Sequence, residues 1–141
     1  MTEFQPLTGH CQCGAVRYRV TAPAQRFYHC HCAMCRRMHG SLFATYAVVP
    51  RPGLVVEAGS EELATYESSP GVHRKRCGKC ACQLFLDVDW KPDLVWYSPA
   101  TAEGHPGHEP EIECHVFVGS KARWHEITDR LPRFEEFPPE E

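Results

Sequence analysis

Cys77-Gly78-Lys79-Cys80 and, far earlier in the chain, Cys11-Gln12-Cys13 are the two stretches that decide the fold. In the later stretch, Gly78 allows a tight turn that aims backbone amides at the two sulfurs. In the earlier one, residues i and i+2 of an extended segment face the same way, so both thiols can meet one ion. Two and two give the four ligands of a closed zinc site that ties the first strand to the middle of the chain.

A third cluster, Cys30-His31-Cys32-Ala33-Met34-Cys35, supplies three thiols within six residues. An ion held by three protein ligands keeps a fourth position for water or a substrate atom, which is the usual arrangement of a catalytic zinc. Zinc in such a site stabilises a bound thiolate or hydroxide at neutral pH. The spacing therefore predicts a second zinc with an open position, and two zinc ions per chain.

Other arrangements of the same thiols stay open. The three thiols could share an ion with Cys77 or Cys80. A fourth ligand could also close the second site and make it purely structural, and the nearby candidates are Cys82, His10, His29 and His39. His31 lies between two ligands, so we expect its side chain to point away from their metal.

The number and grouping of the thiols favour metal over disulfides. The chain has nine cysteines, an odd number, and two cysteines one or two residues apart rarely reach the geometry of a bridge. The first residues, Met1-Thr2-Glu3-Phe4-Gln5-Pro6, lack the basic and apolar regions of a secretory leader. We therefore expect a cytoplasmic protein with reduced thiols.

Composition and charge exclude two classes of partner. The net charge of −3 and the lack of a basic stripe argue against nucleic acid. No apolar stretch approaches the roughly 18 residues that span a membrane. The chain of 141 residues is 43% hydrophobic, which fits one zinc-binding domain over 1–134 followed by an acidic, Pro- and Glu-rich tail over 135–141.

Short apolar runs between turn residues predict a mainly β fold. Val16, Tyr18 and Val20 alternate with polar residues, which is the pattern of a half-buried strand. The apolar segments 42–49 and 54–56 flank Pro50-Arg51-Pro52-Gly53, so we expect a hairpin there. Further expectations are strands at 63–66, 72–76, 84–88, 94–97 and 113–118, helical turns at 34–39 and 121–126, a mobile loop over a site at 101–110, and a frayed tail after 134.

Five stretches carry a resemblance to a known family: Gly9–Tyr18, Cys30–Arg37, Gly40-Ser41, Arg74–Cys80 and His115–Trp124. In this order they resemble the glutathione-dependent formaldehyde-activating enzyme family, which also includes centromere protein V. The resemblance runs from about residue 9 to residue 132. Where the family usually has glycine after the last knuckle, this chain has Ala81.

The resemblance implies a fold, two metal sites and an activity. The fold is an Mss4-like "β-tent" of short antiparallel strands with zinc knuckles. The activity is addition of glutathione to formaldehyde, which gives S-hydroxymethylglutathione and is classed with carbon–sulfur lyases. The implied ligands are Cys11, Cys13, Cys77 and Cys80 for a structural zinc, and Cys30, Cys32 and Cys35 for the second zinc.

The substrate is expected to be glutathione, or a related thiol, together with formaldehyde or another small aldehyde. An open zinc would bind the thiol sulfur or polarise the aldehyde oxygen. Glutathione carries two carboxylates, and the basic residues placed by the motifs to meet them are Arg36 and Arg74, with Arg37 and Arg76 beside them. The same arginines could instead offset the negative charge of zinc-bound thiolates.

Two functions of other classes also fit the residues. The domain could be a non-catalytic, zinc-stabilised binding scaffold, although it lacks a basic extension for chromatin. It could instead be a thiol-based redox or metal-buffering protein that uses Cys82 near a labile zinc, because coordinated thiolates remain oxidisable.

Overall fold

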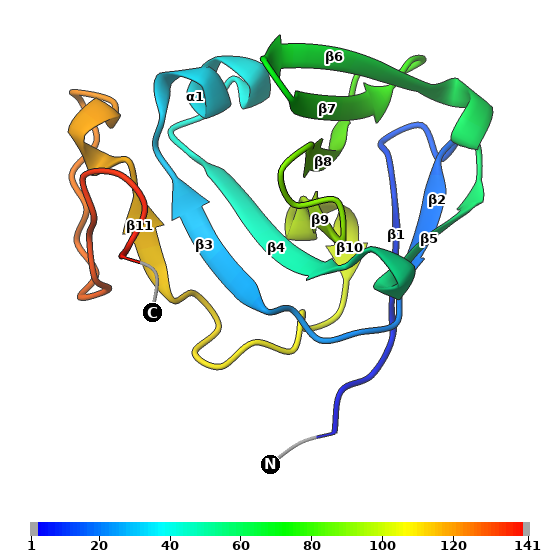
Figure 1. Cartoon of the computed structure of the whole chain (residues 1–141), viewed down its shortest axis with the longest axis horizontal. Coiled ribbons are helices and arrows are strands. Elements are labelled where there is room, and N and C mark those ends of the chain that lie inside the picture. The colour runs from blue at the N-terminus through cyan, green and yellow to red at the C-terminus, as the bar shows by residue number, and fades with distance from the viewer. Residues whose placement is uncertain (1–2, 140–141) are drawn as a thin grey trace.

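Two β-sheets make up residues 3–139, which are the residues that this computed structural model describes (Figure 1). The four-stranded sheet contains, in spatial order, β10 (Ala102–Glu103), β1 (Leu7–His10), β2 (Arg17–Val20) and β5 (Leu54–Ala58). The seven-stranded sheet contains β11 (Cys114–Val116), β3 (Arg26–Cys30), β4 (Ala44–Pro50), β9 (Leu94–Tyr97), β8 (Gln83–Val88), β7 (Val72–Cys77) and β6 (Leu63–Ser69).

Neighbouring strands are antiparallel except β11, which is parallel to β3. The predicted mainly β fold of short, mostly antiparallel strands is therefore confirmed. One α-helix, α1 (Ala33–His39), follows β3 within the described residues, as the sequence predicts for 34–39. Short 3₁₀ turns lie at Arg51–Gly53, Ser60–Glu62, Pro99–Thr101 and Val118–Ser120. No helix among residues 3–139 has the length and apolar character needed to cross a membrane.

The two sheets share a core, and the period-2 pattern of β2 points into it. Val16, Tyr18 and Val20 are each at most 1% exposed. The Tyr18 ring lies edge-on to Phe85 of β8 and Tyr97 of β9, with ring centroids 5.0 and 6.1 Å apart. Burial of these aromatic rings fixes the first sheet against the second on the side where the cysteine turns meet.

The sequence pattern does not predict β1 and β3, for two different reasons. In β1, Gly9 lies opposite Tyr18, and a Cβ atom at Gly9 would lie 2.3 Å from the Tyr18 ring. The inward position of β1 is therefore a glycine, and the sequence does not show the alternation of apolar and polar residues that predicts a strand. In β3, the adjacent residues Phe27 and Tyr28 are both buried, which breaks the period of two.

The predicted hairpin over 42–56 is wrong, because β4 and β5 belong to different sheets. The 3₁₀ turn at 51–53 redirects the chain between them. Gly53 packs so tightly that a Cβ atom there would lie 2.8 Å from the Cβ of Ala22, and its carbonyl accepts a hydrogen bond from the Thr21 amide at 2.8 Å. As a result β5 pairs with β2, while β4 lies between β3 and β9.

Two expectations for the C-terminal third also differ from the structure. No helix forms over 121–126, where the Lys121 ammonium donates to the His125 carbonyl at 2.7 Å in an irregular turn. The segment 101–110 is not a free loop: β10 pairs with β1, and the Pro106 carbonyl accepts from the Ala24 amide at 2.8 Å. Of the predicted tail over 135–141, residues 140–141 lie outside the described part of the chain, and Phe137 packs edge-on against Phe117, with centroids 5.0 Å apart.

Candidate metal centres

The four-cysteine cluster, Cys11, Cys13, Cys77 and Cys80, joins the two sheets. The first two residues lie on the turn between β1 and β2, and the other two lie at the end of β7 and in the turn to β8. All four sulfurs are within 4.8 Å of one another. Sγ of Cys13 is 3.6 Å from that of Cys11 and 3.7 Å from that of Cys77. Tetrahedral zinc with ~2.3 Å bonds needs sulfurs roughly 3.8 Å apart, so these donors fit the ion.

Backbone amides surround the buried sulfurs of this cluster. The Val16 amide donates to Cys11 Sγ at 3.3 Å, and the amides of Lys79 and Cys80 approach Cys77 Sγ at 3.3 and 3.5 Å. Cys11 and Cys77 are fully buried. A buried thiolate requires such donors or a metal, because leaving water costs a charge several kcal/mol. The knuckle is therefore built for ionised sulfur.

The three-cysteine cluster, Cys30, Cys32 and Cys35, lies where β3 passes into α1. Cys30 ends β3, Cys32 is the N-cap of α1, and Cys35 lies in its first turn. The Cys32 sulfur accepts a hydrogen bond from the Cys35 amide at 3.2 Å, so the capping interaction itself fixes one donor atom. The three sulfurs lie within 4.8 Å of one another, which fits a shared zinc ion.

No fourth Cys, His, Asp or Glu ligand joins this cluster among residues 3–139. Cys82, the strongest candidate for a fourth ligand, instead packs against the core that the two sheets share, beside the four-cysteine cluster. The histidines proposed to close the site are engaged elsewhere: His10 contacts the Cys11 carbonyl, His29 contacts Thr45, and His39 contacts Tyr46. Cys77 and Cys80 group with Cys11 and Cys13, so the sharing considered above does not occur.

A buried arginine supports the sulfur of Cys35. Arg74 is 4% exposed, and its guanidinium donates to Cys35 Sγ at 3.5 Å, to the Tyr46 hydroxyl at 2.9 Å and to Ser68 at 2.8 Å. The Tyr46 hydroxyl also lies 3.5 Å from Cys35 Sγ. Hydrogen bonds from Cys30 and Cys32, together with the charge of Arg74, lower the pKa of Cys35. This surrounding favours a thiolate at Cys35.

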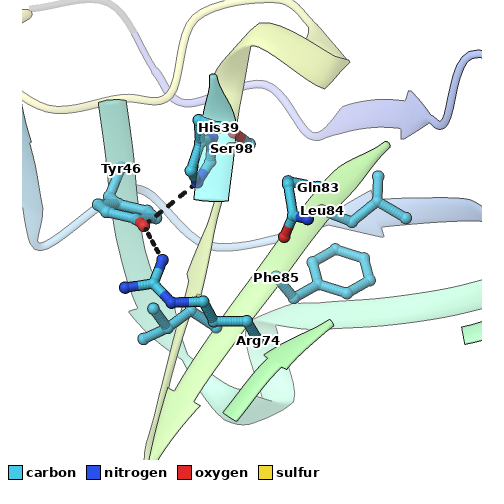
Figure 2. A pocket seen from close by; sticks show the side chains of 8 residues that line it. His39, Tyr46, Arg74, Gln83, Leu84, Phe85 and Ser98 are labelled. Carbon is cyan, nitrogen blue, oxygen red and sulfur yellow. Dashed lines mark hydrogen bonds between the residues drawn. The ribbon is translucent and has the colours of Figure 1, made fainter. Parts of the chain in front are cut away.

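Figure 2 shows Arg74 and His39 on either side of the Tyr46 hydroxyl, at a small cavity of about 10 Å³. This is room for at most one water molecule and excludes any substrate. Sequence reasoning missed Tyr46, because a tyrosine inside an apolar strand is indistinguishable from a core residue. Only the pairing of β4 with its neighbours brings its hydroxyl to Cys35.

An open cleft of about 370 Å³ lies beside α1. Its lining residues are basic, small or apolar: Arg36, Arg37, Gly40, Ser41, Leu42 and Trp124. The Arg36 side chain is held there by donation from Nε to the Ser120 carbonyl at 3.1 Å. Trp124 is 79% exposed, and such exposure is unusual for an indole without a partner. The predicted site residue Arg36 therefore reaches a solvent-open cleft, whereas Arg74 does not.

A mainly β fold with two separate thiol clusters defines the class of protein, namely a small β protein whose cysteines are grouped so that they could hold metal ions. The family model described as glutathione-dependent formaldehyde-activating enzyme matches residues 6–120. The chain therefore belongs to this family, as the sequence motifs predicted.

Curated and solved relatives agree with this assignment. A Halomonas elongata protein, named provisionally as a glutathione-dependent formaldehyde-activating enzyme, is 32% identical over 132 residues, which cover 88% of this chain and 82% of the relative. A Talaromyces marneffei protein with the same provisional name is 28% identical over 54% of this chain and 42% of its own length. A crystal structure of a Rhodobacter sphaeroides protein superposes with a TM-score of 0.58 at 26% identity, covering 69% of this chain and 88% of that one.

Proposed function

We propose that the protein is a zinc-dependent carbon–sulfur lyase acting on the adduct of glutathione, or a related thiol, with formaldehyde or another small aldehyde. The observation that carries the proposal is the three-cysteine cluster, which has three convergent sulfurs and no fourth ligand among the described residues. Zinc held there would lower the pKa of a bound thiol or polarise the aldehyde oxygen. The sulfur–carbon bond forms as the carbonyl π bond breaks, and the thiol proton ends on the former carbonyl oxygen.

The protein's own residues divide into two groups around this chemistry. We assign Arg74 and Tyr46 to Cys35, because their polar atoms already point at its sulfur and are buried. We assign Arg36, with Arg37, to the carboxylates of the thiol substrate, because they line the open cleft beside α1. Trp124 offers an apolar wall for the remainder of the tripeptide. We therefore assign Arg74 no contact with the substrate.

We propose that the four-cysteine cluster holds a closed structural zinc. Its ligands come from turns of two different sheets, so one ion would cross-link chain segments more than 60 residues apart, as in the pair Cys13 and Cys77, which are 64 residues apart. The predicted single domain over 1–134 is supported by the core that both sheets share, by the pairing of β11 with β3, and by the packing of Phe134 against the core around these two strands. Reduced thiols in this number also suit a cytoplasmic location.

The redox alternative is disfavoured by the surroundings of Cys82. Burial raises the pKa of this thiol, and the neighbouring sulfurs Cys80, Cys11 and Cys77 raise it further. A high pKa reduces the thiolate fraction and hence the reactivity towards oxidants. For the scaffold alternative, the open cleft of about 370 Å³ beside α1 is lined by Arg36 and Arg37, and its size and charge fit a small anion better than a protein surface.

The test must separate catalysis from the spontaneous reaction of thiols with formaldehyde. Exchange between free and glutathione-bound ¹³C-formaldehyde is measured by NMR magnetisation transfer with and without enzyme. We expect wild-type protein to accelerate exchange, and Cys32→Ser to return it to the uncatalysed rate. Cys114→Ser, which changes a buried cysteine outside both clusters, is the matched control and should accelerate exchange like wild type. An uncatalysed rate with zinc-loaded wild-type protein would sink the lyase assignment.

A further inference from the structure

Four histidines gather beside the three-cysteine cluster without joining it. His29 and His31 belong to β3 and the residue after its end, His115 lies on the neighbouring strand β11, and His125 lies in the segment beyond. The ring centroid of His31 is 5.0 Å from that of His115 and 6.1 Å from that of His125, and those of His29 and His115 are 5.1 Å apart. His31 is fully buried and His115 is 2% exposed.

A directional chain of hydrogen bonds runs through two of these rings. His115 Nε2 lies 2.9 Å from Asp129 Oδ2, and His31 Nε2 lies 2.8 Å from His115 Nδ1. An ionised carboxylate only accepts, and the hydrogen bond from His115 lowers the pKa of Asp129. His115 Nε2 therefore donates to Asp129, which leaves Nδ1 of His115 to accept from His31 Nε2. His31 Nδ1 is buried without a hydrogen-bond partner, as suits the nitrogen that carries no hydrogen.

We propose that the Asp129–His115–His31 chain positions the sulfurs of Cys30 and Cys32 for the second metal ion. His31 stands between these two ligands in the sequence, and its amide is also fixed, by donation to the Val116 carbonyl at 2.9 Å. With the ring and the amide both held by β11 and the segment after it, the two flanking side chains have little freedom to turn. The inference rests on the proposed function, because it assumes that the three-cysteine cluster binds zinc.

The role assigned here is one of orientation and not of contact with the substrate. Groups that orient ligands typically alter metal affinity by 10- to 100-fold when removed. Asp129, the charged member of this hydrogen-bonded series, lies in the C-terminal segment that runs beside β11. Two backbone hydrogen bonds hold that segment in place: the His115 amide donates to the Pro132 carbonyl at 2.9 Å, and the Phe134 amide donates to the His115 carbonyl at 3.0 Å. The segment after β11 thus reaches back to the start of α1.

The test uses cobalt(II) in place of zinc, because thiolate-to-cobalt absorption reports ligand geometry independently of activity. Two matched pairs separate the hydrogen bond from the bulk of the side chain: His31→Gln keeps a donor where His31→Leu removes it, and Asp129→Asn keeps an acceptor where Asp129→Ala removes it. We expect His31→Leu to weaken the second cobalt site roughly tenfold and to shift its absorption. Asp129→Ala should act in the same direction more weakly, and both conservative variants should stay within about threefold of wild type.

The side chain of Asp129 is 46% exposed, so its pair remains informative if His31→Leu does not fold. Unchanged cobalt spectra and affinities in Asp129→Ala and His31→Leu would overturn the inference while leaving the proposed function intact. Equal losses in the conservative and the disruptive member of each pair would also overturn it, because the hydrogen bond would then be irrelevant. A wild-type protein that binds a single cobalt ion would overturn the proposed function itself.

Discussion

At the scale of single residues, the two arginines Arg36 and Arg74 have different environments. Arg74 is buried and holds Cys35 and Tyr46, whereas Arg36 lines an open cleft. The sequence identified both as basic residues near the ligands, but it could not tell them apart. Burial separates them, since a guanidinium without solvent access has no room for a carboxylate of the substrate.

Substitution of the two arginines should therefore have different effects on stability and on KM. Arg74→Met removes charge-assisted hydrogen bonds in the interior and should lower the free energy of unfolding by about 1.5–3 kcal/mol. Arg36→Met should change stability by less than ~0.5 kcal/mol and raise KM for glutathione about tenfold, the worth of one charge-assisted hydrogen bond. Denaturant unfolding and steady-state kinetics check both. The assignment fails if Arg74→Met raises KM at unchanged stability.

The thiols outside the clusters should be slow to react. Burial raises the pKa values of Cys82 and Cys114, so little thiolate is present at pH 7. In zinc-loaded protein we expect both residues to be alkylated by iodoacetamide more slowly than free glutathione, as followed by mass spectrometry of digested samples. Rapid alkylation of Cys82 would instead support a thiol-based redox function.

At the scale of elements, the strands predicted from the sequence are short apolar or alternating runs bounded by turn residues. The strand β9 lies at the predicted residues, and β2 and β8 lie within two residues of them, because their inward positions carry large apolar side chains. The pattern fails at β1, where Gly9 makes room for the Tyr18 ring, and at the turn over 51–53, where tertiary contacts decide which sheet the next strand joins. Such contacts are not encoded locally.

The turn after the knuckle contains a strained position. Ala81 has φ +64°, a left-handed conformation that costs a residue with a Cβ atom roughly 1–2 kcal/mol. Ala81→Gly should therefore stabilise the protein by about 1 kcal/mol, less the entropy that glycine adds to the unfolded chain. The matched control is Ala64→Gly in β6, where the backbone is ordinary and a loss of roughly 0.5–1 kcal/mol is expected. Thermal unfolding of the zinc-loaded proteins measures both changes. A lower melting temperature for Ala81→Gly than for wild type would contradict a strained left-handed conformation at Ala81.

At the scale of the whole molecule, the two clusters lie on different parts of the fold. The four-cysteine cluster bridges turns of both sheets, and the three-cysteine cluster lies at one junction of strand and helix. The sequence predicted this grouping of the seven thiols from spacing and from the family motifs. It could not predict what surrounds the second cluster, because Tyr46 and Asp129 lie outside the motifs, and the motif that begins at His115 does not say which residues its side chain contacts.

We propose that one metal ion maintains the fold and that the other serves the chemistry. Native mass spectrometry of wild type and Cys32→Ser, with far-ultraviolet circular dichroism on the same samples, tests it most directly. We predict two zinc ions in wild type and one in Cys32→Ser, with an unchanged spectrum and an intact four-cysteine site. One zinc ion in wild type, or unfolding of Cys32→Ser, would contradict this division of roles between two metal ions.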